Sequence, residues 1–183
     1  MPFPPTDITY TRDGMGFSYR IAGIVVHNGC VLLQNTEREP GYAFPGGGAA
    51  FGETSAETLA REFREELGVE IVVGELKWVE ENFATWGGAD FHQIVLTFAV
   101  ELAGGIEIPM SGRFKCLETR TGGNQVWFTW VPIERLRDSG VTVYPHAAAD
   151  LLANWDQGVQ HIVRRAAPGG PCGAPPTPKN TNA

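Results

Sequence analysis

The sequence has little cysteine, no long apolar run and no excess of positive charge, and each absence narrows the possible functions. Its three cysteines are far apart and odd in number, so they indicate neither a disulfide framework nor a zinc site. We expect free thiols in a reducing cytoplasm. No apolar segment approaches the ~20 residues of a membrane-spanning helix. The first residues lack the basic and apolar segments of a signal peptide, so a cytoplasmic protein without a membrane partner is expected.

The charge balance is acidic, with 14 lysines and arginines against 21 aspartates and glutamates and a formal net charge of −7. Such a chain lacks the broad positive surface that binds nucleic acid, so a nucleic-acid partner is not expected. A small nucleotide is compatible with this charge, because a bound metal ion reverses it locally and a few arginines suffice for phosphate groups.

The 183 residues are enough for one domain with a sizeable core and two tails. We expect an N-terminal arm at residues 1–16, a domain at 17–165 and a C-terminal tail at 166–183. The tail is rich in proline, glycine, threonine and asparagine, so it buries too little apolar surface to fold and is predicted to be disordered.

Apolar runs bounded by turn residues predict strands on both sides of a helix, which is the pattern of an α/β fold. Asn28-Gly29 is a strong hairpin signal between the first two strands. Pro132 and Pro145 mark the starts of two short helices. The strands are expected at 17–27, 31–34, 71–73, 76–83, 93–102 and 125–131, and the short helices at 132–136 and 146–155.

The most specific pattern is at residues 47–69, where two glycines, four carboxylates and one arginine stand at fixed offsets. Seven residues at fixed spacing would match a given start in a sequence of average composition only about 10⁻⁸ of the time. Read alone, the glutamates are a solvated helix face, as most charge runs are, but the accompanying glycines argue against that reading. The seven are Gly47, Glu53, Arg61, Glu62, Glu65, Glu66 and Gly68.

Residues 55–67 are predicted to form an amphipathic helix. Thr54 and Glu57 have the spacing of a capping box at its start, and Gly68 is a natural C′ residue at its end. Three glutamates are expected on a face roughly 120° from the apolar stripe. The stripe consists of Ala56, Leu59, Ala60, Phe63 and Leu67.

Three carboxylates on one helix face repel each other unless a cation lies between them. Mg²⁺ prefers oxygen ligands, and Mn²⁺ is an alternative, so Glu62, Glu65 and Glu66 are the predicted metal ligands. Arg61 is four residues from both Glu57 and Glu65, and we expect it to pair with either and so hold a ligand carboxylate in place.

The segment before this helix is predicted to bind phosphate. Gly46 and Gly47 belong to a glycine-rich loop that allows close approach of a phosphate, beside the partial positive charge of the helix N-terminus. Arg20 and Arg38 are candidates for binding phosphate oxygens, with simple surface roles as the alternative. The aromatic candidates for stacking on a base, for which core packing is the alternative, are Tyr42, Phe44, Trp86, Phe91 and Trp127.

Residues 47–69 resemble the signature of the Nudix hydrolases, a family that cleaves a diphosphate linked to another moiety with the help of divalent metal. The resemblance implies an α/β/α sandwich with a mixed β-sheet and a loop–helix–loop catalytic motif. It also implies metal-dependent hydrolysis of a phosphoanhydride in a nucleoside di- or triphosphate or a nucleoside diphosphate-linked compound. Glu66 or Glu65 is then the first candidate for the residue that orients or deprotonates water, with Glu53 as an alternative. A homodimer is common in the family.

Outside the signature, Glu80 to Phe83, followed by Phe91 to Ile94, look like a pattern of one Nudix subgroup. An acid often follows the histidine in that subgroup, whereas here Gln93 follows His92. Segment 103–124 holds three basic residues and is either a substrate-side loop or a surface excursion. The later carboxylates that can join such a site, each with a surface role as the alternative, are Glu101, Glu107 and Glu118.

Two readings compete with hydrolysis on this scaffold. A nucleotide sensor without turnover would be expected to lose part of the acidic set, which is intact here. An isomerase of prenyl diphosphates fits the unaltered signature less well. Nucleoside triphosphates, nucleotide sugars and dinucleotides all present the same diphosphate to the motif, so the motif alone does not select the substrate.

Overall fold

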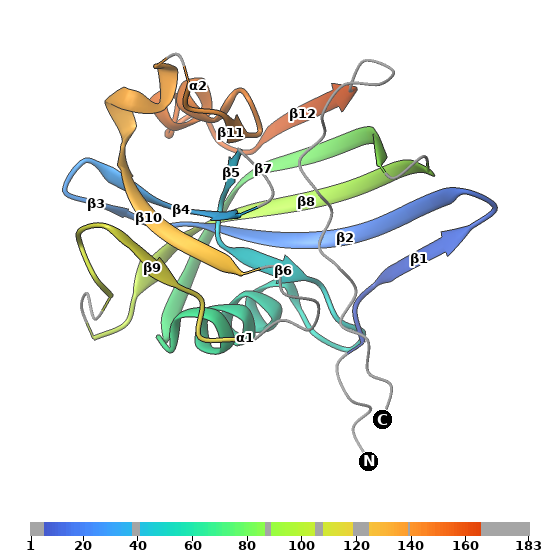
Figure 1. Ribbon diagram of the computed structural model, residues 1–183, viewed down its shortest axis with the longest axis horizontal. Coiled ribbons are helices and arrows are strands. Elements are labelled where there is room, and N and C mark those ends of the chain that lie inside the picture. The colour runs from blue at the N-terminus through green and yellow to red at the C-terminus, as the bar shows by residue number, and fades with distance from the viewer. Residues whose placement is uncertain are drawn as a thin grey trace.

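The protein folds as an α/β/α sandwich in the computed structural model, which describes residues 6–37, 41–86, 89–104, 108–118, 125–138 and 140–165. Two six-stranded sheets lie between helix α1 (Ser55–Leu67) on one side and helix α2 (Ala148–Ala153) with the 3-10 helix η1 (Ile133–Arg137) on the other (Figure 1). This arrangement confirms the predicted fold class. No helix in the described ranges is both long and apolar enough to cross a membrane.

The first sheet contains the long strands and has the order β1-β2-β8-β7-β12. Strand β6 pairs with the part of β2 that does not pair with β1. Strands β2 and β8 are parallel, as are β7 and β12, whereas β7 and β8 are antiparallel, so the sheet is mixed. Its strands are β1 (Thr9–Arg12), β2 (Met15–Ile24), β6 (Gly46–Gly48), β7 (Ile71–Trp86), β8 (Ala89–Leu102) and β12 (Gln160–Arg165).

The second sheet is built from shorter strands and has the order β11-β5-β4-β10-β9, with β3 paired to β4. Strands β5 and β11 are parallel, and the other pairs are antiparallel. Its strands are β3 (Val26–His27), β4 (Cys30–Thr36), β5 (Tyr42–Ala43), β9 (Arg113–Lys115), β10 (Val126–Pro132) and β11 (Val143–Tyr144).

The predicted hairpin at Asn28-Gly29 is confirmed, because both residues have positive φ, 49° and 73°, as a two-residue type I′ turn requires. The expectation of one strand over 17–27 is wrong. The chain leaves the first sheet after Ile24 and enters the second at Val26, so the segment serves two sheets. The expected strands 71–73 and 76–83 are one strand, β7, interrupted by register shifts between Val73 and Trp78.

Part of the segment that we expected to be an N-terminal arm lies in the first sheet. Strand β1 pairs with β2 in the antiparallel register Thr9 to Ser18, and Asp7 forms a bridge with Ala50. The short turn at Asp13-Gly14, where φ is 51° and 75°, reverses the chain between the two strands. The predicted tail at 166–183 lies outside the described residues.

Two apolar cores lie on opposite sides of the sheets. The α1 side contains Leu59 and Phe63, whose burial is worth about 1.5–3 kcal/mol each, packed against strands of both sheets. The α2 side contains Trp78 and Phe44, whose rings meet edge to face at 5.5 Å, packed beneath α2 and η1. The two cores fix the sheets between the helices and hold β6 against α1.

Candidate active site

Helix α1 begins and ends where its sequence predicts. Thr54 Oγ1 accepts a hydrogen bond from the Glu57 backbone N–H at 3.2 Å, and Glu57 Oε2 accepts one from the Thr54 backbone N–H at 2.8 Å. These hydrogen bonds lower the pKa of Glu57. Gly68 ends the helix in the left-handed conformation, with φ of 71°. The capping box therefore uses Glu57, and α1 is fixed at both ends.

Two of the three predicted metal ligands are buried in the core rather than displayed on a separate face. Glu62 is 2% exposed and Glu66 is fully buried, whereas the side chain of Glu65 is 38% exposed. The buried face of α1 is thus different from the predicted apolar stripe, because Ala56 is exposed and Glu62 and Glu66 are buried. That face consists of Thr58, Leu59, Glu62, Phe63, Glu66 and Leu67.

Arg61 joins the acidic residues of this region into one network. Its Nε donates to Glu53 Oε1 at 2.9 Å, and its Nη1 donates to Glu62 Oε1 at 2.5 Å and to Glu65 Oε2 at 3.3 Å. Nη2 donates to Glu53 Oε2 at 3.1 Å and to the Gly48 carbonyl at 3.2 Å. Burial alone would lower the pKa of Arg61, but the hydrogen bonds and charges of Glu53 and Glu62 outweigh it and raise that pKa.

Glu53 is held from two sides. It receives the Arg61 hydrogen bonds and a further one from Thr58 Oγ1 at 2.9 Å. Because Thr58 lies on the first turn of α1 and is fully buried, the carboxylate of Glu53 is fixed at the junction between the glycine segment and the helix. The sequence placed Glu53 at this junction, and the structure brings it together with Arg61 and Glu62.

The glycine segment is a strand, not the predicted loop. Residues 46–48 form β6 and pair with β2 in the register Gly47 to Ile21. A Cβ on Gly46 would meet the Ile21 carbonyl, and one on Gly47 would overlap the carboxyl group of Glu62. Glycine is required here because β2 and α1 approach the backbone of β6 from two sides.

The other residues predicted to bind substrate lie in different environments. Arg20 is paired in register with Gly48, and its Nη2 donates to the Phe44 carbonyl at 3.3 Å. The ring of Phe44 lies in the core at 2% exposure, so it has no surface on which a substrate can stack. Arg38 lies outside the described residues.

Of the later carboxylates, only Glu118 is brought close to α1 by a recorded contact. The backbone N–H of Leu117 donates to the Glu66 carbonyl at 2.8 Å, so Glu118 follows directly on a segment bound to the end of the helix. Glu101 is exposed on β8, where it pairs in register with Val72, and Glu107 lies outside the described residues. Glu118 is therefore the strongest of the three candidates.

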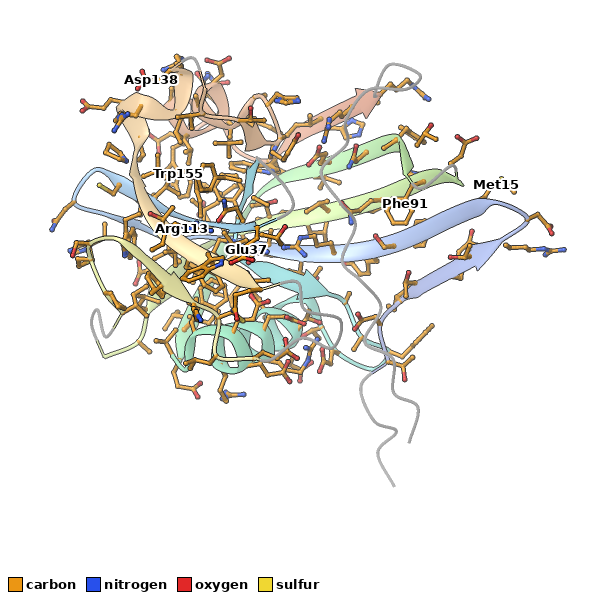
Figure 2. All side chains as sticks on the ribbon, viewed as in Figure 1. Met15, Glu37, Phe91, Arg113, Asp138 and Trp155 are labelled. Carbon is orange, nitrogen blue, oxygen red and sulfur yellow. The ribbon has the colours of Figure 1, made fainter. Side chains whose placement is uncertain are left out.

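The aromatic candidates do not converge on α1. Phe91 lies against Gly16 in the first sheet, and Tyr42 is half-buried beside the core on the α2 side. Trp127 is on the second sheet, where the Arg113 guanidinium lies 4.7 Å from its ring and Glu37 accepts from its Nε1 at 3.3 Å (Figure 2). The side chain of Trp86 is not among those described.

His92 and Gln93 are placed by the sheet and not by α1. His92 stacks on Phe83 with ring centroids 4.2 Å apart and meets Phe17 edge-on at 5.8 Å. Gln93 is buried and donates from Nε2 to Ser18 Oγ at 2.9 Å. A structural role for His92 agrees with these contacts.

The donor set of α1 has the chemistry that a hard divalent cation requires, since Glu62, Glu65 and Glu66 offer only oxygen atoms. The missing side chain of Gly47 makes room for the Glu62 carboxyl group, because a Cβ there would overlap it. Within the described ranges, no three His, Cys, Asp or Glu side chains converge closely enough to form a ready metal cage.

The structure buries two polar residues of the pattern that the sequence singles out at Glu80 to Phe83. Glu80 is 5% exposed and Asn82 is 8% exposed on β7, and they share a face with the buried Trp78. The sequence carried a signal for them, since a charge and an amide at i+2 and i+4 from a core tryptophan put polar atoms on an apolar face.

The sequence matches known proteins. The family model for the NUDIX domain matches residues 18–151. A Mycobacterium tuberculosis protein named "Putative 8-oxo-dGTP diphosphatase 2" is 34% identical over 122 residues, which are 63% of this chain and 81% of that protein.

Two solved structures are similar at low sequence identity, so their likeness shows the fold alone. The MutT protein from Bacillus halodurans is 20% identical with a TM-score of 0.56, and the match covers 80% of this chain and 90% of that one. A NUDIX hydrolase from Nitrosomonas europaea is 14% identical with a TM-score of 0.56, and the match covers 80% and 78%.

Proposed function

The chain belongs to the Nudix hydrolase family and is a nucleoside phosphate pyrophosphohydrolase, and from this premise we propose that it cleaves a phosphoanhydride with Mg²⁺ held on α1. Nudix hydrolases generally use divalent metal ions. Mn²⁺ is the alternative ion. The proposed substrates are nucleoside di- or triphosphates and nucleoside diphosphate-linked compounds. Oxidised dGTP is the first to test, since the M. tuberculosis relative is named for it.

One observation carries the proposal: the single guanidinium of Arg61 pairs with Glu53, Glu62 and Glu65, and the buried Glu66 lies one turn from Glu62. Four carboxylates and one guanidinium have a formal charge of −4 + 1 = −3. Buried carboxylates are costly unless paired or bound to metal. A divalent cation would neutralise most of this negative charge. The negative charge therefore favours the binding of such a cation.

Glu62, Glu65 and Glu66 are the proposed ligands of this cation. When bound, the ion polarises a phosphorus–oxygen bond and lowers the pKa of a bound water. The protein fixes the ligand set, because Arg61 ties Glu62 to Glu53 and to the carbonyl of Gly48. Such positioning groups around metal ligands are worth about 10–100-fold in affinity or activity.

The remaining steps belong to the chain's own residues. Gly46 and Gly47 bring the backbone of β6 close to the Glu62 carboxyl group, and the diphosphate is proposed to bind beside them. Arg20, in register with Gly48, is the proposed contact of a phosphate oxygen. Glu66 or Glu65 is the proposed group that orients or deprotonates water, with Glu53 and Glu118 as alternatives.

The test is a nucleotide- and phosphate-release screen with Mg²⁺ or Mn²⁺ over nucleoside di- and triphosphates, 8-oxo-dGTP, nucleotide sugars, ADP-ribose and dinucleoside polyphosphates. Glu66→Gln should lower kcat by roughly 10³-fold, because a charge that binds and activates is lost while shape is kept. Glu70→Gln is the matched control, since Glu70 is exposed just after α1 and only pairs with Arg64 at 2.7 Å.

Metal-dependent turnover that is lost in Glu66→Gln and kept in Glu70→Gln supports the proposed function. Full activity of Glu62→Gln, Glu65→Gln and Glu66→Gln, all folded by circular dichroism, contradicts the proposed site. Metal-dependent binding of one nucleotide without turnover by the unaltered protein contradicts hydrolysis and favours a sensor.

A further inference from the structure

An aromatic row crosses the first sheet on the face that also carries α1. Each member is paired in register with the next, so the row runs over five neighbouring strands from β1 to β12. Side chains in register share a face, and Tyr19, two residues along β2, packs on the α1-side core. The aromatic row consists of Tyr10, Phe17, His92, Phe83 and, at its end, Arg165.

Every neighbouring pair in the aromatic row is in contact. Tyr10 stacks on Phe17 with ring centroids 5.6 Å apart, and Phe17 meets His92 edge-on at 5.8 Å. His92 stacks on Phe83 at 4.2 Å, and the Arg165 guanidinium lies 4.2 Å from the centre of the Phe83 ring. The row is therefore a continuous surface of rings that ends at β12 in a cation–π contact.

The aromatic row is more accessible than the other face of the same strands. Tyr10 is 61% exposed, and the adjoining rows add Met15 and Val163, each more than half exposed. On the other face, Ser18 and Gln93 are more than nine-tenths buried. Figure 1 shows the ends of β2, β7 and β8 beyond α1, which does not reach over them. Neighbouring exposed apolar side chains of this kind mark an interaction surface.

The area of this surface suits a single chain segment better than a second copy of the protein. Four strand spacings of about 4.8 Å make it about 19 Å wide, and three rows of side chains make it about 20 Å high, or roughly 400 Å². A stable protein–protein interface covers about 800 Å² on each partner. One extended segment lying along the aromatic row needs no larger area.

The chain itself supplies such a segment at the end of the row. Arg165 is the last described residue, and residues 166–183 hold five prolines, one lysine and no acidic residue. Proline-rich sequences favour the polyproline II conformation, which docks on surfaces lined by aromatic rings. At about 3.1 Å per residue, about six residues beyond Arg165 span the distance from β12 to β1.

His92 adds a polar requirement to the aromatic row. Its Nε2 is buried and has no hydrogen-bond partner among the residues that the structure describes. Buried polar atoms in native proteins are almost always paired, so a partner from another segment is expected. The carbonyl groups of a polyproline II segment make no hydrogen bonds within it, and one of them can accept from an imidazole N–H.

We propose that the C-terminal segment 166–183 docks on the aromatic row of its own chain, with Pro168 and Pro171 against the rings and a carbonyl group at His92. The disorder predicted for this segment from its sequence follows from the lack of a core within it. The aromatic row provides an apolar surface outside the segment, so that reason no longer applies. This interaction is independent of the proposed hydrolysis.

Paramagnetic broadening in the full chain tests the proposal. Cys172 lies in the segment, so Cys30→Ser combined with Cys116→Ala leaves it as the only cysteine for a nitroxide label. Circular dichroism and the amide spectrum of the reduced label check that this protein is folded.

The oxidised label should weaken the amide signals of Tyr10, Phe17 and Phe83 strongly. Val26 and Leu117 are exposed apolar residues outside the aromatic row, and their signals are the reference for random contact. Equal broadening of the row and the reference residues, or no broadening of either, would overturn the inference.

Two substitutions in the labelled protein test the contacts separately. Tyr10→Ser removes the most exposed ring, and His92→Phe keeps a ring while removing the N–H donor, so both should reduce the broadening at Phe83. Val72→Ser is the matched control, since Val72 is also more than half exposed but lies at the other end of β7. Undiminished broadening in both Tyr10→Ser and His92→Phe would overturn the inference.

A mixed sample shows which chain holds the segment. Nitroxide-labelled protein without isotope is mixed with ¹⁵N-labelled protein that carries Cys172→Ser. Unchanged signals of Tyr10 and Phe83 in this mixture, together with their broadening in the singly labelled chain, support docking within one chain. Broadening in the mixture would show that a second copy binds the segment and would overturn the proposal.

Discussion

Carboxyl groups are buried on both sides of the first sheet, but the protein treats them differently. On the α1 side, Arg61 supplies hydrogen bonds to Glu53, Glu62 and Glu65 from one guanidinium. On the opposite side, Glu80 has a buried oxygen without a hydrogen bond in the described chain. The first group is arranged in advance by the protein, and the second lacks an equivalent arrangement.

The difference separates two kinds of function. A site for chemistry gains from carboxylates whose positions are fixed before the ligand arrives, because misplacement lowers the rate steeply. A site for selection gains from acceptors that are satisfied only by the correct ligand, because a wrong ligand leaves them unmatched. The hydrogen bonds of Arg61 give the α1 network the first property.

A substitution at Gly47 should disturb the carboxylates on the α1 side most severely. In Gly47→Ala the new Cβ overlaps the Glu62 carboxyl group, so Glu62 must move away from Arg61 and its proposed metal site. We expect kcat to fall by about 100-fold, since a shift of about 1 Å at a reacting group has that effect. Steady-state kinetics at saturating Mg²⁺ measure the loss.

Gly74→Ala is the control for the Gly47 substitution. Its Cβ would lie 3.4 Å from the nearest atom, the Ala99 carbonyl oxygen, which is an ordinary contact. We expect its kcat to stay within about twofold of the unaltered protein, because nothing near the site moves. Equal kcat values for both variants would show that the overlap with Glu62 does not matter for the reaction.

The pH dependence of stability tests Glu80, the buried carboxyl group on the opposite side of the sheet. The folded-state pKa of Glu80 is raised above its ordinary value of 4.5, mainly by burial. Its contribution is therefore fully present below the unfolded-state pKa and is lost as pH rises through the folded-state pKa. In Glu80→Gln this loss is absent, so the variant should gain stability relative to the unaltered protein between pH 4 and 8, by at most about 1.4 kcal/mol per pH unit.

Urea unfolding without nucleotide, at several pH values, measures this difference. Arg164, whose charge acts on Glu80, is the same in both proteins, so its effect cancels in the comparison. A constant difference between the two proteins from pH 4 to 8 would mean that Glu80 has the same pKa folded and unfolded.

The limits of α1 were predictable from sequence because they depend on neighbours along the chain. Thr54, Glu57 and Gly68 lie within a turn of the groups that they cap, and helix α1 spans the predicted residues 55–67. The carboxylates could likewise be identified by spacing. The surroundings of these carboxylates could not be predicted in this way. The burial of Glu62 depends on β6, which is fixed by pairing with β2 more than twenty residues away.

Sheet pairing explains the other differences as well. Spacing made Arg61 a partner of Glu57 or Glu65, whereas the fold turns it mainly to Glu53, eight residues away. Strand β12 was not predicted because its alternating, half-exposed residues resemble a surface segment until β7 pairs with it. Glu80 and Asn82 share a face because side chains alternate along β7.

The smallest expected effect comes from the cap of α1, which supports the fixed network without touching it. Thr54→Ala removes the hydrogen bond from Thr54 Oγ1 to the Glu57 N–H and should lower the free energy of unfolding by about 1 kcal/mol, or Tm by about 2–4 °C. Thr54→Ser keeps the hydroxyl and should retain most of the stability. Because Arg61 holds the carboxylates independently of the first turn, kcat of both variants at 25 °C should match that of the unaltered protein. A large loss of kcat in Thr54→Ala alone would show that the cap, and not Arg61, fixes the acidic network.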